Sequence, residues 1–335
     1  LLIAVADLHE LIVTPVLSLL VAAVGAYTLV YAYRFVIEDR EKRWIQHAFR
    51  HYLAPALVDR LQENPDALKL GGEERWVTVM FTDIAGFTTI SEGLKETPDR
   101  LVDLMNRYLT VMSEVIARHD GYVDKFIGDA VMAVWGAPLA VENAERKAVD
   151  AALDCQAALE VFNREVVVDF LPSGRMGTRI GVATGPAIAG NMGSTQRLNY
   201  TVTGDMVNLA ARLEGANKEY GTAIMISELT AQAVGDGYVL RRLDRLIVKG
   251  KTEPIVVFEV LGRRGEVVET VLARLAEFER ALGLHDARDF AAAMAVFRKL
   301  APADPPSRVY ADRCEAYLVT PPPADWQGEF ALKTK

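Results

Sequence analysis

The stretch VTVMFTDIAGFTTISEG, residues 77–93, joins an apolar strand pattern to a carboxylate and a glycine. Apolar side chains at positions 77, 79 and 81 alternate along the chain, which predicts a buried or half-buried strand. Asp83 follows this strand directly, and Gly86 lies just beyond it. An aspartate alone at such a position is most simply a turn residue that caps the next helix. Asp83 therefore gains a functional meaning only if a second group elsewhere in the chain meets it.

The composition is that of a folded, acidic protein. The chain has 335 residues, 51% of them hydrophobic and 24% charged, and its formal net charge is -8. This negative charge argues against a general nucleic-acid binder, which would present a basic face. Cys155 and Cys314 are the only cysteines and belong to no CxxC motif, which indicates a reducing compartment without a disulfide framework. The five histidines show no metal-ligand spacing.

Residues 11–33 contain no charged side chain. A mostly apolar stretch of this length can cross a hydrocarbon core of about 30 Å. The basic segment that follows, residues 34–50, predicts a cytoplasmic side for everything downstream, and hence an anchor in the inner cell membrane. A buried core helix or a signal peptide is the alternative, although no small-residue cleavage site follows. Because the first residue is Leu, we expect this chain to be a fragment that lacks an earlier part.

The whole chain divides into four predicted regions. Residues 1–35 form the predicted membrane segment, and residues 36–71 read as a helical connector interrupted at Pro55. Residues 72–262 form the main folded domain. Residues 263–335 combine small and aromatic residues at helical spacing, and this helical tail resembles one or two tetratricopeptide-type helices.

The main domain reads as strand, helix, strand, strand, helix, strand. Thr97 and Pro98 are typical of the start of a helix, and residues 121–136 form two short apolar runs that predict a hairpin. Residues 179–193 predict a strand pair, and the glycines within residues 184–194 are interpreted as turn residues. The sequence therefore predicts an α+β fold with a ferredoxin-like βαββαβ core, in which helices cover one face of a sheet.

A second carboxylate, Asp129, lies in the predicted hairpin. In a βαββ unit the first strand and the hairpin are neighbours in the sheet, so Asp83 and Asp129 can converge on one point. Two carboxylates and a backbone carbonyl, for which Ile84 is well placed, form a hard oxygen site for Mg²⁺ or Mn²⁺. Such ions commonly share their remaining positions with substrate phosphates, so the pattern indicates a nucleotide enzyme.

Five motifs in this order resemble the catalytic domain of class III adenylate/guanylate cyclases over residues 72–262. They are FTDIAGFTTISE (81–92), DKFIGDAVMAVWG (124–136), RIGVATGPAIAGNMGS (179–194), NYTVTGDMVNLAARLE (199–214) and VKGKTEP (248–254). The membrane segment and connector also resemble the transducer region of bacterial cyclases that carry an extracytoplasmic CHASE2 sensor.

The resemblance implies roles for individual residues. Asp83 and Asp129, assisted by the Ile84 carbonyl, would hold two Mg²⁺ or Mn²⁺ ions in each active site. The pair that reads the purine would be Lys125 and Thr201. Asn208 and Arg212 would position the ribose and stabilise the phosphorus. Lys249 would bind the terminal phosphates, with Lys251 as a further candidate.

The purine pair predicts ATP as the substrate. Lys125 can donate to N1 of adenine, and the Thr201 hydroxyl can accept from the exocyclic amine. Guanine reverses this pattern. Thr201 stands where many adenylate cyclases have Asp, a replacement that the family associates with bicarbonate sensitivity. The implied reaction is attack of the ribose 3′-oxygen on the α-phosphorus, which gives 3′,5′-cyclic AMP and pyrophosphate in signal transduction.

The resemblance also implies a homodimer. The metal residues of each active site come from one subunit, whereas Lys125, Thr201, Asn208 and Arg212 come from the other. Because one chain carries every residue of this set, a symmetric dimer would contain two complete sites. A monomer should be inactive.

Three other functions remain as alternatives. A guanylate or diguanylate cyclase is one, since GGEER at residues 71–75 resembles the diguanylate cyclase motif but precedes the predicted first strand. A catalytically silent regulatory domain is another, although none of the expected site residues is missing. A membrane-anchored scaffold that acts through the tail would leave the site residues unexplained.

Overall fold

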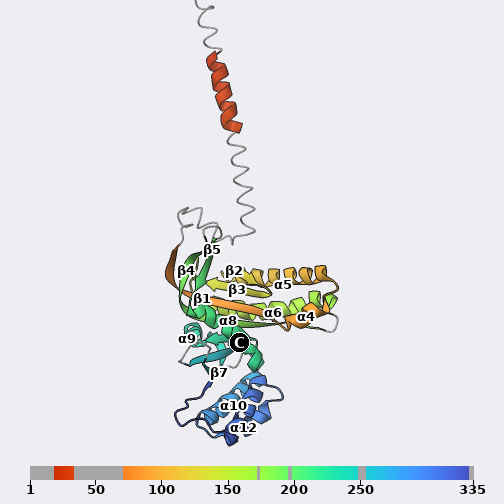
Figure 1. The fold of residues 1–335 in the computed structure, drawn as a ribbon, viewed down its shortest axis with the longest axis vertical. Helices are drawn as coiled ribbons and strands as arrows, with labels where there is room; N and C mark the ends of the chain where they lie inside the picture. Colours follow the sequence, from red (N-terminus) through yellow and green to blue (C-terminus); the bar gives the residue numbers. More distant parts are fainter. Residues whose placement is uncertain (1–18, 34–70, 172–173, 195–197, 248–253, 332–335) are drawn as a thin grey trace, which may run out of the picture. The chain divides into compact units, whose positions relative to one another are not determined.

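The computed structural model describes residues 19–33, 71–171, 174–194, 198–247 and 254–331 (Figure 1). The chain separates into two units, Leu1–Gln62 and Glu63–Lys335. In the first unit, residues 19–33 form a helix.

The predicted membrane span over residues 11–33 is not confirmed. Its first part, residues 11–18, lies outside the described residues, and no helix within the described ranges is long and apolar enough to cross a membrane. Most of the predicted connector also lies outside the described residues.

The second unit contains the predicted βαββαβ core. Its first four main strands lie in the order β2-β3-β1-β4, with antiparallel neighbours, as the ferredoxin-like arrangement requires. The elements of this core are β1 (Gly71–Ala85), α4 (Phe87–Gly93), α5 (Pro98–Arg118), β2 (Tyr122–Ile127), β3 (Ala130–Trp135), α6 (Ala144–Phe162) with a π-helical turn (Asn163–Val167), α7 (Val168–Phe170) and β4 (Gly177–Gly193).

The sheet continues beyond this core. β6 runs parallel to β4, β8 and β7 follow in antiparallel pairing, and β5 pairs with the far end of β4. These elements are β5 (Leu198–Thr203), α8 (Asp205–Tyr220), β6 (Ile224–Ser227), α9 (Glu228–Val234), a 3₁₀ turn (Gly235–Gly237), β7 (Tyr238–Ile247) and β8 (Ile255–Arg263).

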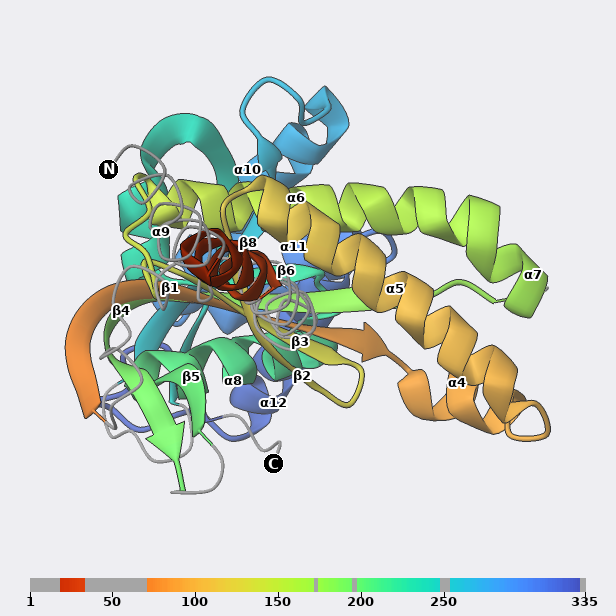
Figure 2. The ribbon, with the colours of Figure 1, turned by 90° about the horizontal axis from the view of Figure 1, so that it is seen from above.

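Helices cover both faces of the sheet, so the expectation that they cover one face was wrong. Ile180 and Val182 of β4 belong to the apolar core that α5 and α6 build. Gly181 between them points to the other face, where a Cβ atom would lie 2.2 Å from the Ala210 carbonyl oxygen of α8. The missing side chain thus lets the backbone of α8 contact the sheet directly. Figure 2 shows α5 and α6 on one side of the strands and α8 on the other.

The prediction of a strand pair over residues 179–193 was also wrong, because β4 is one strand of 17 residues. Its glycines do not all make turns. A Cβ atom at Gly190 would lie 2.0 Å from the carbonyl oxygen of Gly71, so this glycine permits the close approach of β1. β1 itself begins at Gly71, and the GGEER segment is therefore part of the first strand rather than a loop before it.

The tail forms three helices and a short strand: α10 (Glu269–Asp286), α11 (Phe290–Leu300), α12 (Pro305–Val319) and β9 (Glu329–Ala331). The helices enclose their own apolar cluster, in which the rings of Phe278 and Tyr310 meet edge to face with centroids 5.8 Å apart. β9 pairs in parallel with β7. The tail therefore extends the sheet, while its likeness to tetratricopeptide helices stays a prediction.

Candidate active site

The structure brings the two aspartates together at one end of β1. Asp83 lies near the end of this strand, and Asp129 lies in the turn between β2 and β3. The backbone N–H of Ile84 donates to Oδ2 of Asp129 over 3.2 Å, while the Ile84 side chain is buried in the core. The β-hairpin is thus fixed against β1 at the point where both carboxylates are half-buried.

Two further charged residues surround Asp83, and the sequence analysis missed both. Arg179 lies opposite Asp83 in the β1–β4 pairing and donates to its carboxylate over 2.6 Å. The same guanidinium donates to Glu214 of α8 over 2.8 Å. Antiparallel pairing of the first strand with RIGVATG could have indicated Arg179, but the register that sets the two residues opposite each other is not readable from one sequence.

The electrostatics at Asp83 favour a bound cation. Burial raises the pKa of Asp83 to about 6, and the negative charges of Glu214 and Asp129 add to the effect, whereas the hydrogen bond from Arg179 opposes it. A divalent ion between Asp83 and Asp129 would offset both the burial and the repulsion.

The donor set fits Mg²⁺ or Mn²⁺. Asp83 and Asp129 offer only oxygen atoms, which hard divalent ions prefer. Within the described ranges, no group of three or more His, Cys, Asp or Glu side chains is arranged to hold a metal. A site of two carboxylates would leave positions for water and for substrate phosphates.

The predicted purine pair is in contact. Nζ of Lys125 on β2 donates to the Thr201 hydroxyl on β5 over 2.9 Å. The same hydroxyl donates to Asp124, whose side chain is only 1% exposed. Burial raises the pKa of Asp124, and the Thr201 hydroxyl and the Lys125 charge oppose this rise. Asp124 therefore fixes the direction in which the Thr201 hydroxyl proton points.

Asp124 could not be recognised from the sequence because of an irregularity in β2. Successive residues of a regular strand point to opposite faces, so Asp124 and Lys125 should not reach the same partner. The pairing of β2 with β3 shifts between Val123 and Lys125, and both side chains contact Thr201. A one-residue shift of this kind leaves no mark in the pattern of apolar residues.

Asn208 and Arg212 lie one turn apart on α8. Asn208 is exposed and Arg212 is half-buried, and within the described part of the chain no hydrogen bond or ion pair engages either side chain. Neither forms such a bond to Asp83 or Asp129 in the same protomer. Lys249 and Lys251, predicted to bind the phosphates, lie outside the described residues.

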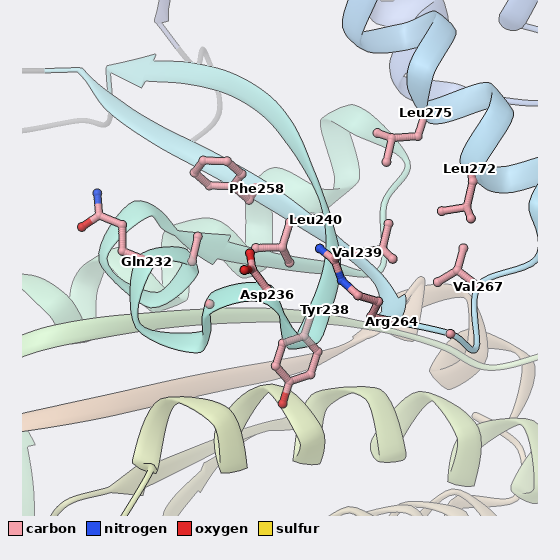
Figure 3. Close-up of a pocket in the computed structure, with 13 residues that line it drawn as sticks. Gln232, Asp236, Tyr238, Val239, Leu240, Phe258, Arg264, Val267, Leu272 and Leu275 are labelled. Atoms are coloured by element: carbon pink, nitrogen blue, oxygen red, sulfur yellow. The ribbon is translucent and has the colours of Figure 1, made fainter.

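A separate cavity of 670 Å³ lies between α9, β7, β8 and α10 (Figure 3). Among the described residues, its lining contains none of the predicted site residues, and Asp236 and Arg264 are the charged ones. Its walls are otherwise mostly apolar, with Leu240, Leu272 and Leu275 among them. This cavity lacks the paired carboxylates of the site above and is not part of it.

Comparisons with known proteins agree with the motifs. The family described as adenylate and guanylate cyclase catalytic domain matches residues 72–261. Adenylate cyclase 1 of Rhizobium meliloti (strain 1021) is 42% identical over 195 residues, which cover 57% of this chain and 29% of that protein. The chain thus spans less than a third of the length of this curated relative.

Solved structures of adenylyl and guanylyl cyclases are similar to this chain. The adenylyl cyclase CyaB from P. aeruginosa is 31% identical with a TM-score of 0.54, and the match covers 59% of this chain and 100% of that one. The guanylate cyclase domain of RhGC from Catenaria anguillulae, solved with GTP, is 30% identical with a TM-score of 0.50, and the match covers 57% and 100% of the two chains.

Proposed function

Because the chain belongs to the adenylate and guanylate cyclase catalytic domain family, we propose that it is an adenylate cyclase, which converts ATP into 3′,5′-cyclic AMP and pyrophosphate. The hydrogen bond from Thr201 to Asp124 is the observation that supports ATP rather than GTP as the substrate. The Thr201 hydroxyl gives its proton to a carboxylate, so toward a purine it acts as an acceptor. Adenine presents an amine donor there, whereas guanine presents a carbonyl oxygen that finds no donor in Thr201.

The catalytic roles follow from charge and position. Asp83 and Asp129 would hold the divalent ions, which when bound favour the deprotonated ribose 3′-oxygen and balance charge on the leaving group. The 3′-oxygen forms a bond to the α-phosphorus, the bond from that phosphorus to the bridging oxygen breaks, and the hydroxyl proton is released. Asn208 orients the ribose. The Arg212 guanidinium stabilises negative charge at the phosphorus.

The active form in this proposal is a homodimer with two shared sites. In support, Asn208 and Arg212 make no side-chain hydrogen bond or ion pair with the residues that the structure describes, as expected of groups that serve a neighbouring subunit's metal site. We also propose that the uncharged stretch over residues 11–33 anchors the chain in the inner cell membrane, with the catalytic domain on the cytoplasmic side.

The first experiment incubates the full chain with ATP or with GTP and Mn²⁺, and identifies products by chromatography. We expect cyclic AMP from ATP at a rate well above cyclic GMP from GTP. A larger yield of cyclic GMP would favour the guanylate cyclase alternative. No cyclic nucleotide from a sample shown to be dimeric would overturn the enzyme and leave the silent regulatory domain.

Replacing Asp124 by Asn tests the basis of the ATP preference. The amide of Asn can donate to the Thr201 hydroxyl, which frees the hydroxyl proton to meet guanine. We expect Asp124→Asn to reduce the ratio of kcat/KM for ATP over GTP about tenfold, equivalent to about 1.4 kcal/mol. Asp103→Asn is the matched control, because Asp103 pairs with Arg107 on an exposed face of α5. An unchanged ratio in Asp124→Asn would show that Asp124 does not set specificity.

A further inference from the structure

The last residue of α8 is built into a buried cluster that the tail completes. Tyr220 is 1% exposed, and its hydroxyl donates to Asp244 of β7. Arg313 of α12 donates to the same carboxylate over 2.7 Å. A second nitrogen of this guanidinium lies 3.3 Å from the Tyr220 hydroxyl. One strand, the tail and the end of α8 therefore meet in a single hydrogen-bonded triangle.

This triangle is held in place on all sides. The side chains of Arg313 and Asp244 are 5% and 1% exposed, so water does not compete for their ion pair. The Arg313 guanidinium also lies over two rings, 4.7 Å from the centroid of Tyr310 and 3.8 Å from that of Phe330. An arginine fixed by a carboxylate and two rings has one available position, and Tyr220 is bound to that position.

A second contact holds the same end of α8. Gly221 caps this helix with φ 65°, a left-handed conformation that suits glycine. A Cβ atom at Gly221 would lie 2.7 Å from Cβ of Pro305, the first residue of α12. The start of α12 thus packs directly on the cap of α8, independently of the triangle.

The first half of α8 carries the residues proposed for catalysis. Arg212 and Tyr220 are eight residues apart on one continuous helix, or about 12 Å along its axis. A displacement at Tyr220 therefore reaches Arg212. The groups proposed to read the purine and to hold the metals lie on β1, β5 and the β2–β3 hairpin, outside α8.

We propose that the C-terminal helices position α8 for catalysis and that Tyr220 is the positioning residue through which they do so. Arg313 and Asp244 hold the Tyr220 hydroxyl, Tyr220 holds the end of α8, and α8 sets the place of Asn208 and Arg212. The tail is then a working part of the active site although it touches no substrate. This inference rests on the proposed function, because it uses the roles given there to Asn208 and Arg212.

Two isosteric variants of the full chain separate positioning from general packing. Tyr220→Phe removes the hydroxyl that ties α8 to the triangle. Tyr310→Phe is the matched control: Tyr310 is equally buried, and its hydroxyl donates over 2.8 Å to the Leu243 carbonyl and also faces Asp244, so it joins the tail to β7 but makes no direct bond to α8. We expect Tyr220→Phe to lower kcat for ATP about tenfold, with KM within about twofold, and Tyr310→Phe to leave both within about twofold. Equal losses of kcat in the two variants would overturn the proposal.

A double variant tests whether Tyr220 acts through the catalytic end of the helix. If it does, adding Tyr220→Phe to Arg212→Ala lowers kcat by a smaller factor than Tyr220→Phe does in the wild-type chain, because one of the two residues it positions is already gone. Losses that multiply in full would mean that Tyr220 acts elsewhere, and this too would overturn the proposal.

Hydrogen exchange gives a readout that does not need activity. Tyr220→Phe should speed amide exchange over residues 213–220 of α8 and leave β1 unchanged, whereas Tyr310→Phe should leave α8 unchanged. Unaltered exchange in α8 of Tyr220→Phe would overturn the anchoring. A wild-type chain that forms no cyclic nucleotide would instead overturn the proposed function, while exchange would still decide whether the tail holds α8.

Discussion

Mixing the Asp83→Ala variant with the Arg212→Ala variant is expected to restore cyclic AMP synthesis that neither variant supports alone. Asp83→Ala removes a metal-holding carboxylate, and Arg212→Ala removes the cation proposed to stabilise the phosphorus. Each loss should lower kcat at least about a hundredfold. In a mixed dimer one site receives both defects, and the other site receives an intact Asp83 from one subunit and an intact Arg212 from its partner.

The activity expected of the mixture follows from random pairing of the two kinds of subunit. If subunits exchange freely at equal concentrations, half the dimers are mixed and half their sites are intact, so activity should reach about a quarter of the wild-type value. Mixing Asp83→Ala with Asp129→Ala is the matched control, because both changes affect the metal-holding half and every site stays broken. Failure of the first mixture to recover, with exchange shown by differently tagged chains, would mean that each site is built within one subunit.

Replacing Gly181 by Ala should cost both stability and activity. The new Cβ atom would lie 2.2 Å from the backbone of α8 at both the Ala210 carbonyl oxygen and the Glu214 nitrogen. Backbone cannot move aside as a flexible side chain can, so α8 must shift away from the sheet. We expect a loss of about 3 kcal/mol in the free energy of unfolding and a melting temperature lower by roughly 6–10 °C. Because α8 carries Asn208 and Arg212, kcat should fall about a hundredfold.

Gly215→Ala is the matched control on the same helix. Gly215 is exposed, and a Cβ atom there would have no neighbour within 4 Å. This change should stabilise the helix by about 0.5–1 kcal/mol and leave activity intact. Thermal melting and kcat, measured on both variants, test whether close packing of α8 on β4 is required for stability and activity. A Gly181→Ala protein as stable and active as the wild type would show that α8 does not depend on close contact with β4.

The approach of Asp83 to Asp129 could be predicted because its signals are local. Asp83 ends an apolar alternation, Asp129 lies in a turn between two short apolar runs, and the βαββ order alone makes their strands neighbours. Asn208 and Arg212 were singled out by the resemblance to cyclases, and their spacing of four on one helix adds that they share one face.

The missed features depend on contacts between distant segments. Asp124 reaches Thr201 through a shift in strand pairing, and Arg179 meets Asp83 through register, neither of which leaves a local pattern. Gly181 could be given no role from the sequence, because glycine is ambiguous there. Its close contact with the backbone of α8 can be recognised only once α8 is known to pack on that face of the sheet.

The pairing of β9 with β7 has a consequence for where this protein can be cut. The stretch that matches the family ends at residue 261, yet β9 covers the outer edge of β7, and Arg313 neutralises Asp244 from the far side of that boundary. A chain cut at residue 261 would expose the edge of β7, which could then pair with strands of other chains. It would also leave the buried Asp244 carboxylate without the positive charge of Arg313. The segment that matches the family is therefore shorter than the segment that completes the edge of β7 and the Arg313–Asp244 ion pair.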